Sequence, residues 1–196
     1  MNVIAHTSQN RPPRTPPACP RCAFDPATCD RHTAPDLLRD TTTDWQHVLA
    51  GPDVTRSCAG TPAWTVLEHG CHVRDMCLLF RRQLDTMLGE PRNIAPSSEV
   101  TNSPTRYCDE DARQVAGELG RAATALADRL TALTADDWER EDPRLPDLRL
   151  TLGVLTRHLL HDIRHSLHDA RRGIRAPDAR TATATAHPQN NEDGHG

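Results

Sequence analysis

Histidines recur at helical spacing near the end of the chain: His158, His161, His165 and His168. Because residues three, four and seven apart share one face of an α-helix, we expect all four imidazoles along one side of the segment 157–170. His161 and His165 have the His-x-x-x-His spacing that suits two ligands of one metal ion. A third imidazole from a facing helix would complete a site with one position open for water or substrate.

The same histidines also fit a solvated helix face. At about 100° per residue, the apolar side chains of this segment gather on a different arc, which holds Leu152, Leu155, Leu159, Ile163 and Leu167. Arg157, Arg164 and Arg171 border the histidine arc on one edge, and Asp162 and Asp169 border it on the other. Either aspartate would be a surface residue on this interpretation. Beside a metal, an aspartate would instead accept a hydrogen bond from a ligating imidazole and orient it.

Further histidines stand upstream in the run His69-Gly70-Cys71-His72. Thr65 is followed three residues later by Glu68, the spacing of a capping box, so the sequence predicts that a helix begins here. His69 and His72 would then lie on a second helix. Glu68 has two interpretations: it supports a site near His72, or it caps the helix.

The stretch from Trp64 to Asp75 resembles the DinB/YfiT-like metalloenzyme superfamily. In that family a tryptophan and a glutamate precede a histidine on the second helix, as Trp64 and Glu68 precede His72, and the fourth helix carries a His-x-x-x-His pair. The resemblance covers about residues 35–172. It implies a four-helix bundle in which three histidines bind a divalent ion, usually zinc or nickel.

Carried over residue by residue, the resemblance implies His72, His161 and His165 as the metal ligands. His69 competes with His72, and His158 competes with His165, because each alternative stays near the same helix face. These alternatives remain open at the level of the sequence.

A cysteine-rich segment precedes the helices, with the pattern Cys-x2-Cys-x6-Cys-x2-His. Cys19, Cys22, Cys29 and His32 would supply the four ligands of a tetrahedral structural zinc site. A redox Cys-x-x-Cys pair is one alternative, although no βαβ pattern surrounds it. A cysteine-rich arm without metal is another.

Some DinB-like proteins begin with a similar Cys-x-x-Cys-Gly-Phe-Asp stretch. Here Cys19, Cys22, Phe24 and Asp25 match it, with Ala23 in place of the glycine. On this resemblance the cysteine pair belongs to the subfamily, and Cys29 and His32 are incidental.

Four amphipathic segments predict an all-α fold, an antiparallel four-helix bundle. We expect helices over about residues 35–50, 65–88, 109–133 and 150–172, with Gly173 ending the last one. Residues 1–18 are predicted to be a disordered arm, 19–34 the cysteine-rich turn, 35–173 the bundle and 174–196 a disordered tail. Loops are expected over residues 54–62, 93–106 and 136–147, the second of them long enough to cover a site.

Composition excludes several classes of function. All 23 basic residues are arginine, so neither a lysine Schiff base nor a P-loop lysine can form. The net charge of −4 argues against nucleic acid as a partner. No apolar run suits a membrane span or a signal peptide, so we expect a cytoplasmic protein. In a reducing cytosol its 7 cysteines would be thiols or metal ligands.

Together these features favour a divalent-metal-dependent enzyme acting on a small-molecule substrate. By resemblance, characterised DinB-like enzymes include thiol S-transferases that use mycothiol or bacillithiol, so a low-molecular-weight thiol is the expected co-substrate. Hydrolysis by metal-bound hydroxide would need the same ligands. The alternatives are a non-catalytic metal-binding or stress-associated bundle, with a homodimer as its candidate assembly, and an adaptor that binds a protein partner through the cysteine arm and the tail.

Overall fold

The computed structural model describes residues 17–52, 54, 64–89 and 107–175. The predicted disordered segments lie almost wholly outside this range, as do most of residues 54–62 and 93–106, so the expectations for them rest on the sequence alone. In the described residues, the regular structure is helical apart from one isolated β-bridge between Glu141 and Thr151, which confirms the all-α prediction. None of the described helices is long and apolar enough to cross a membrane.

Four long helices form the bundle: α1 (Ala34–Leu49), α2 (Val66–Met87), α3 (Ala112–Thr131) and α5 (Leu152–Arg175). The short helix α4 (Ala135–Trp138) lies in the segment predicted to be a loop, and α5 continues past Gly173. Three short 3-10 helices complete the described elements: η1 (Pro26–Thr28), η2 (Tyr107–Asp109) and η3 (Pro146–Leu148).

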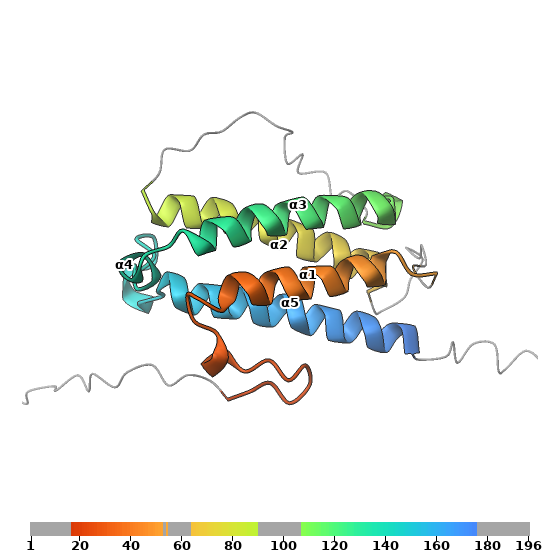
Figure 1. The fold of residues 1–196 in the computed structure, drawn as a ribbon, viewed down its shortest axis with the longest axis horizontal. Helices are drawn as coiled ribbons and strands as arrows, with labels where there is room; N and C mark the ends of the chain where they lie inside the picture. Colours follow the sequence, from red (N-terminus) through yellow and green to blue (C-terminus); the bar gives the residue numbers. More distant parts are fainter. Residues whose placement is uncertain (1–16, 53, 55–63, 90–106, 176–196) are drawn as a thin grey trace, which may run out of the picture.

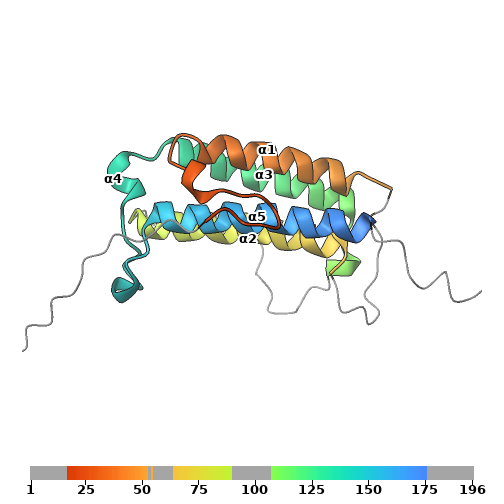
Figure 2. The ribbon, with the colours of Figure 1, turned by 90° about the horizontal axis from the view of Figure 1, so that it is seen from below.

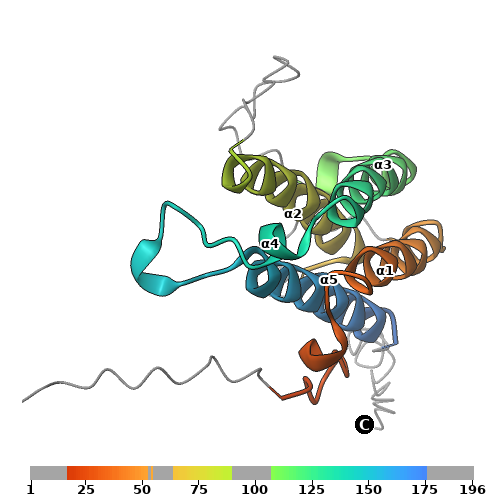
Figure 3. The ribbon, with the colours of Figure 1, turned by 60° about the vertical axis from the view of Figure 1, so that its left-hand side comes forward.

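The direction of the helices differs from the predicted antiparallel order. Helices α1 and α5 run one way and α2 and α3 run the other way (Figure 1). Both α1 and α2 pack against α3 and α5, so α1 and α2 occupy diagonal corners (Figure 3). The bundle therefore has two antiparallel and two parallel neighbouring pairs. Helices α2 and α3 can be parallel because a long stretch of chain joins them, which a short loop would not permit.

The core is built from the apolar faces of the four helices. Trp45 is fully buried, and its indole N–H donates to the carbonyl of Ile163 at 3.2 Å, which fixes α1 against α5. Trp138 of α4 covers the first turn of α5, where a Cβ on Gly153 would collide with the indole ring. The guanidinium of Arg157 lies 5.6 Å from the centre of the same indole ring, so α4 helps to hold Arg157 in place.

Helix α5 has two unlike faces. Its apolar side chains are buried in the core: Leu152, Leu159, Leu160, Ile163, Leu167 and Ala170. At about 100° per residue, the histidine arc lies on the opposite side of the helix. Residues 17–29, here called the N-terminal arm, run along this outer face (Figures 1 and 2).

Candidate metal centre

The N-terminal arm begins with a tight turn that brings Cys19 and Cys22 together. The Cys19 N–H donates to the Phe24 carbonyl at 2.8 Å, and the Ala23 N–H donates to the Cys19 carbonyl at 2.9 Å. Ala23 has a φ of +56°, in the left-handed region that closes such a turn. Just beyond it, the Asp25 side chain accepts from the N–H of Ala27 and caps η1. Local hydrogen bonds therefore position both sulfurs.

Ala23 holds a left-handed backbone conformation, which favours glycine. An L-residue in the left-handed region costs about 1 kcal/mol or more, and glycine avoids most of that cost. We expect Ala23→Gly to stabilise the turn and to slow amide hydrogen exchange of Cys19 and Ala23 about fivefold, the equivalent of ~1 kcal/mol. Ala27, exposed in the same arm and without a positive φ, is the control, since Ala27→Gly should speed exchange. Faster exchange in Ala23→Gly would contradict this account of the turn.

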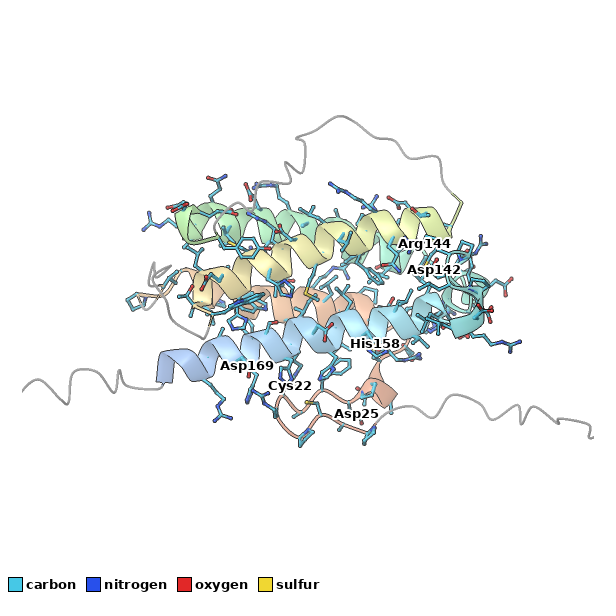
Figure 4. All side chains as sticks on the ribbon, turned by 180° about the vertical axis from the view of Figure 1, so that it is seen from behind. Cys22, Asp25, Asp142, Arg144, His158 and Asp169 are labelled. Carbon is cyan, nitrogen blue, oxygen red and sulfur yellow. The ribbon has the colours of Figure 1, made fainter. Side chains whose placement is uncertain are left out.

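Three polar contacts dock the N-terminal arm onto the outer face of α5. They are the bonds from Arg164 Nε to the Cys22 carbonyl (3.2 Å) and from Arg157 Nε to the Cys29 carbonyl (2.9 Å), and the ion pair of Arg21 with Asp169 (2.7 Å). Phe24 of the arm is buried and stacks on the ring of His161, with centroids 5.6 Å apart. Figure 4 shows Cys22 and Asp25 of the arm beside Asp169 and His158 of α5. The predicted solvated face is thus covered by a separate segment of the chain.

Docking brings two cysteines and two histidines into one cluster, formed by Cys19, Cys22, His161 and His165. One donor atom from each lies within 4.8 Å of all the others. Cys19 Sγ is 3.6 Å from His165 Nδ1. His161 Nε2 is buried and has no hydrogen-bond partner, an arrangement that costs free energy unless something binds that nitrogen.

The donor set and its spacing fit a tetrahedral ion. With metal–sulfur bonds of about 2.3 Å and metal–nitrogen bonds of about 2.0–2.1 Å, neighbouring donor atoms would lie roughly 3.4–3.8 Å apart. The observed cluster needs only a small contraction to reach that size. Two thiolates and two imidazoles are a ligand set that zinc commonly takes.

The two thiols of the cluster differ in acidity. The pKa of Cys19 is lowered to about 5, chiefly because the N–H of Cys22 hydrogen-bonds to its sulfur, with a further contribution from the His161 side chain. Burial raises the pKa of Cys22. Because a thiolate is the form that binds metal, Cys19 is already in its binding form at neutral pH, and an incoming ion must displace the proton of Cys22.

Asp169 lies beside His165, where a carboxylate would orient a ligating imidazole. Its Oδ2 lies 3.5 Å from His165 Nε2, while the other ring nitrogen of His165 faces Cys19. A carboxylate on one side of an imidazole fixes the ring and favours metal binding through the nitrogen on the other side. Asp162, the other candidate, is exposed.

Of the three histidines implied by the resemblance, the structure brings together His161 and His165. In the described part of the chain, the group with metal-ligand spacing does not include His72, which lies edge-on to the indole of Trp64 with centroids 5.0 Å apart. His69 contacts the same indole at 5.3 Å. Glu68 accepts a hydrogen bond from the Thr65 N–H at 2.7 Å, so it caps α2. The three-histidine ligand set stays a prediction.

The predicted cysteine site is likewise divided. Cys19 and Cys22 join the cluster, whereas Cys29 is buried elsewhere in the arm and His32 is exposed in the turn that precedes α1. Burial raises the pKa of the Cys29 thiol to about 11, which disfavours the thiolate that a metal would need. Two residues of each predicted site thus meet in one cluster. The sequence offered one signal of this: histidines on the arc opposite the apolar arc are accessible to a segment from outside the bundle.

The sequence model of the DinB superfamily matches residues 23–170. The matched region contains both histidines of the cluster and begins just after its two cysteines. No curated protein and no solved structure matches the chain.

Proposed function

Because this chain belongs to the DinB superfamily, we propose that it is a metal-dependent DinB-like protein whose ion is held by Cys19, Cys22, His161 and His165. The observation that carries the proposal is the convergence of these four donors, with a buried and unpartnered nitrogen on His161. Zinc is the ion that this donor set favours, because thiolate ligands disfavour magnesium and calcium.

For the reaction, we propose thiol S-transfer with a low-molecular-weight thiol of the mycothiol type. A bound ion would lower the pKa of a coordinated thiol or water and polarise an electrophile. Cys22 is buried, whereas Cys19 is partly exposed. Cys19 is therefore the cluster thiol that lies nearest to an incoming thiol from solvent. Asp169 and Phe24 would hold the two imidazoles in place.

A non-catalytic metal-binding bundle is the second candidate, and the closed ligand set favours it. Four protein ligands are typical of structural zinc sites, whereas catalytic sites keep one position for water or substrate. On this proposal the ion fastens the N-terminal arm to α5 and does no chemistry.

The ligand set is tested by the metal content of the purified full-length chain, measured by mass spectrometry after zinc loading. We expect about one ion per chain, lost in His161→Ala and retained in His72→Ala. His158→Ala is the matched control, because His158 is exposed on the same helix and outside the cluster. Loss in His72→Ala together with retention in Cys19→Ser would instead favour the three-histidine set. A folded, zinc-supplemented wild-type chain without metal would overturn the proposal.

Turnover separates the two functions once the ion is present. The zinc-loaded wild type is supplied with a low-molecular-weight thiol and an electrophilic substrate, and consumption of the thiol is followed. An S-transferase should consume thiol at a rate that His161→Ala abolishes and His158→Ala preserves. Stable zinc binding without consumption of thiol would favour the non-catalytic bundle.

A further inference from the structure

Cys19 and Cys22 form a thiol pair whose members differ in access. Their sulfurs belong to the group of atoms within 4.8 Å of one another. Cys19 is partly exposed, while Cys22 is buried. An S–S bond is about 2.05 Å long, so the sulfurs must move closer, and a Cys-x-x-Cys turn permits that movement. The accessible thiol can meet a reagent from solvent, and the buried thiol is placed to react with the product.

We propose that Cys19 and Cys22 are a redox-modification site at which a hydroperoxide produces a disulfide, releasing the metal and detaching the N-terminal arm from α5. This inference rests on the proposed function for the identity of the metal ligands. It adds a regulatory reaction of the same two side chains.

The proposed oxidation takes place in two steps. The Cys19 sulfur attacks one oxygen of the hydroperoxide, so that an S–O bond forms, the O–O bond breaks, and the departing oxygen takes a proton and leaves as water or an alcohol. The Cys22 thiolate then attacks the sulfur of the resulting sulfenic acid. An S–S bond forms, the S–O bond breaks, and hydroxide takes a proton and leaves as water. The two thiols lose two electrons in total, and the hydroperoxide gains them.

Burial protects the other described thiols from an oxidant in solution. Cys29, Cys71 and Cys77, the other thiols whose side chains the structure describes, are all buried. Cys71 also lies 3.9 Å from the carbonyl of Tyr107. A reagent from solvent therefore meets Cys19 first among these five thiols.

Loss of the two sulfur ligands would weaken the docking of the arm. A disulfide sulfur carries no charge and is a far poorer ligand than a thiolate, so the ion would keep only the two imidazoles of the cluster. The ion pair between Arg21 and Asp169 is partly exposed and contributes little alone, because the Arg21 side chain is 56% exposed. Two hydrogen bonds from arginines and the stacking of Phe24 on His161 would remain. Each of these contacts contributes far less than a bound metal ion, so we expect the arm to open more readily once the ion leaves.

The test uses the full-length chain loaded with zinc and treated with about one equivalent of hydrogen peroxide. Three quantities are followed: zinc released to a chromogenic chelator, the disulfides found by peptide mapping, and amide hydrogen exchange of residues 17–29. We expect zinc release to parallel the appearance of a Cys19–Cys22 disulfide, and exchange in the arm to rise at least tenfold while α3 stays unchanged. A dithiol reductant with added zinc should restore the initial state. Cys29→Ser should respond like the wild type, because Cys29 lies outside the cluster.

Retention of zinc while other cysteines are oxidised would overturn the inference, as would zinc release without a Cys19–Cys22 disulfide. The zinc content before oxidant tests the proposed function separately. If the untreated chain holds no zinc, that proposal fails, and the peptide map still decides the redox reaction: treated protein without a Cys19–Cys22 disulfide contradicts it.

Discussion

Replacing Cys22 with serine is expected to abolish the stabilisation that zinc gives to the folded chain. A ligand that binds only the native state raises the free energy of unfolding by RT ln(1 + [L]/Kd), about 4 kcal/mol at a thousandfold excess over Kd. For a chain of this size that corresponds to a rise in the melting temperature of roughly 10 °C. A serine hydroxyl is a poor ligand at neutral pH, so Cys22→Ser should keep less than about 2 °C of this rise. Thermal unfolding of metal-free and zinc-saturated protein measures both values.

Cys29→Ser is the matched control for this measurement. Cys29 is a buried cysteine of the same N-terminal arm, and it lies outside the metal-ligand cluster. Serine at this position should lower the stability of the metal-free protein, because it buries a hydroxyl, yet leave the zinc-dependent rise intact. An equal zinc-dependent rise in Cys22→Ser and wild type would show that the ion binds elsewhere.

The helices were predictable because local patterns determine them. Apolar residues at helical spacing located all four long helices, and the capping box of Thr65 and Glu68 marked the start of α2. The direction of each helix was not predictable in the same way, since a 3.6-residue period is identical whichever way a helix runs. The short helix α4 was missed because its 4 residues are too few to show a period.

The cluster itself depends on contacts that no local pattern encodes. The bond between Arg164 and Cys22 joins residues 142 positions apart. From the sequence, Arg157 and Arg164 border a histidine arc and fit a solvated edge equally well. In the folded chain, both donate to carbonyls of the N-terminal arm and hold it there. The spacing of the histidines could therefore show that they share a face, but could not show what covers that face.

The position of the histidine arc explains why two predicted sites gave one cluster. The apolar arc of α5 is occupied by the core, so imidazoles on the opposite arc face away from the other helices. A chain segment outside the bundle can reach them directly. The Cys-x-x-Cys turn is such a segment. The backbone hydrogen bonds that close this turn orient both sulfurs toward His161 and His165.

Asparagine in place of Asp169 is expected to weaken zinc binding about 10- to 100-fold, the usual effect of removing a carboxylate that supports a ligating histidine. Asp169 positions His165 through Nε2, so that the nitrogen facing Cys19 stays available to the ion. Competition titration against a chelator of known affinity measures the change. Because the absorption spectrum of bound cobalt reports ligand geometry, it should also shift in Asp169→Asn.

Asp169 also pairs with Arg21, so two controls separate positioning of the imidazole from docking of the arm. Arg21→Ala removes the ion pair and leaves the contact with His165, and it should cost less than about threefold in affinity, as expected for an exposed ion pair. Asp169→Glu keeps a carboxylate and should recover part of the affinity and of the cobalt spectrum. Equal losses in Asp169→Asn and Arg21→Ala, with no spectral change, would mean that Asp169 acts only by holding the arm. The larger loss in Asp169→Asn follows only if the carboxylate orients a metal-binding imidazole.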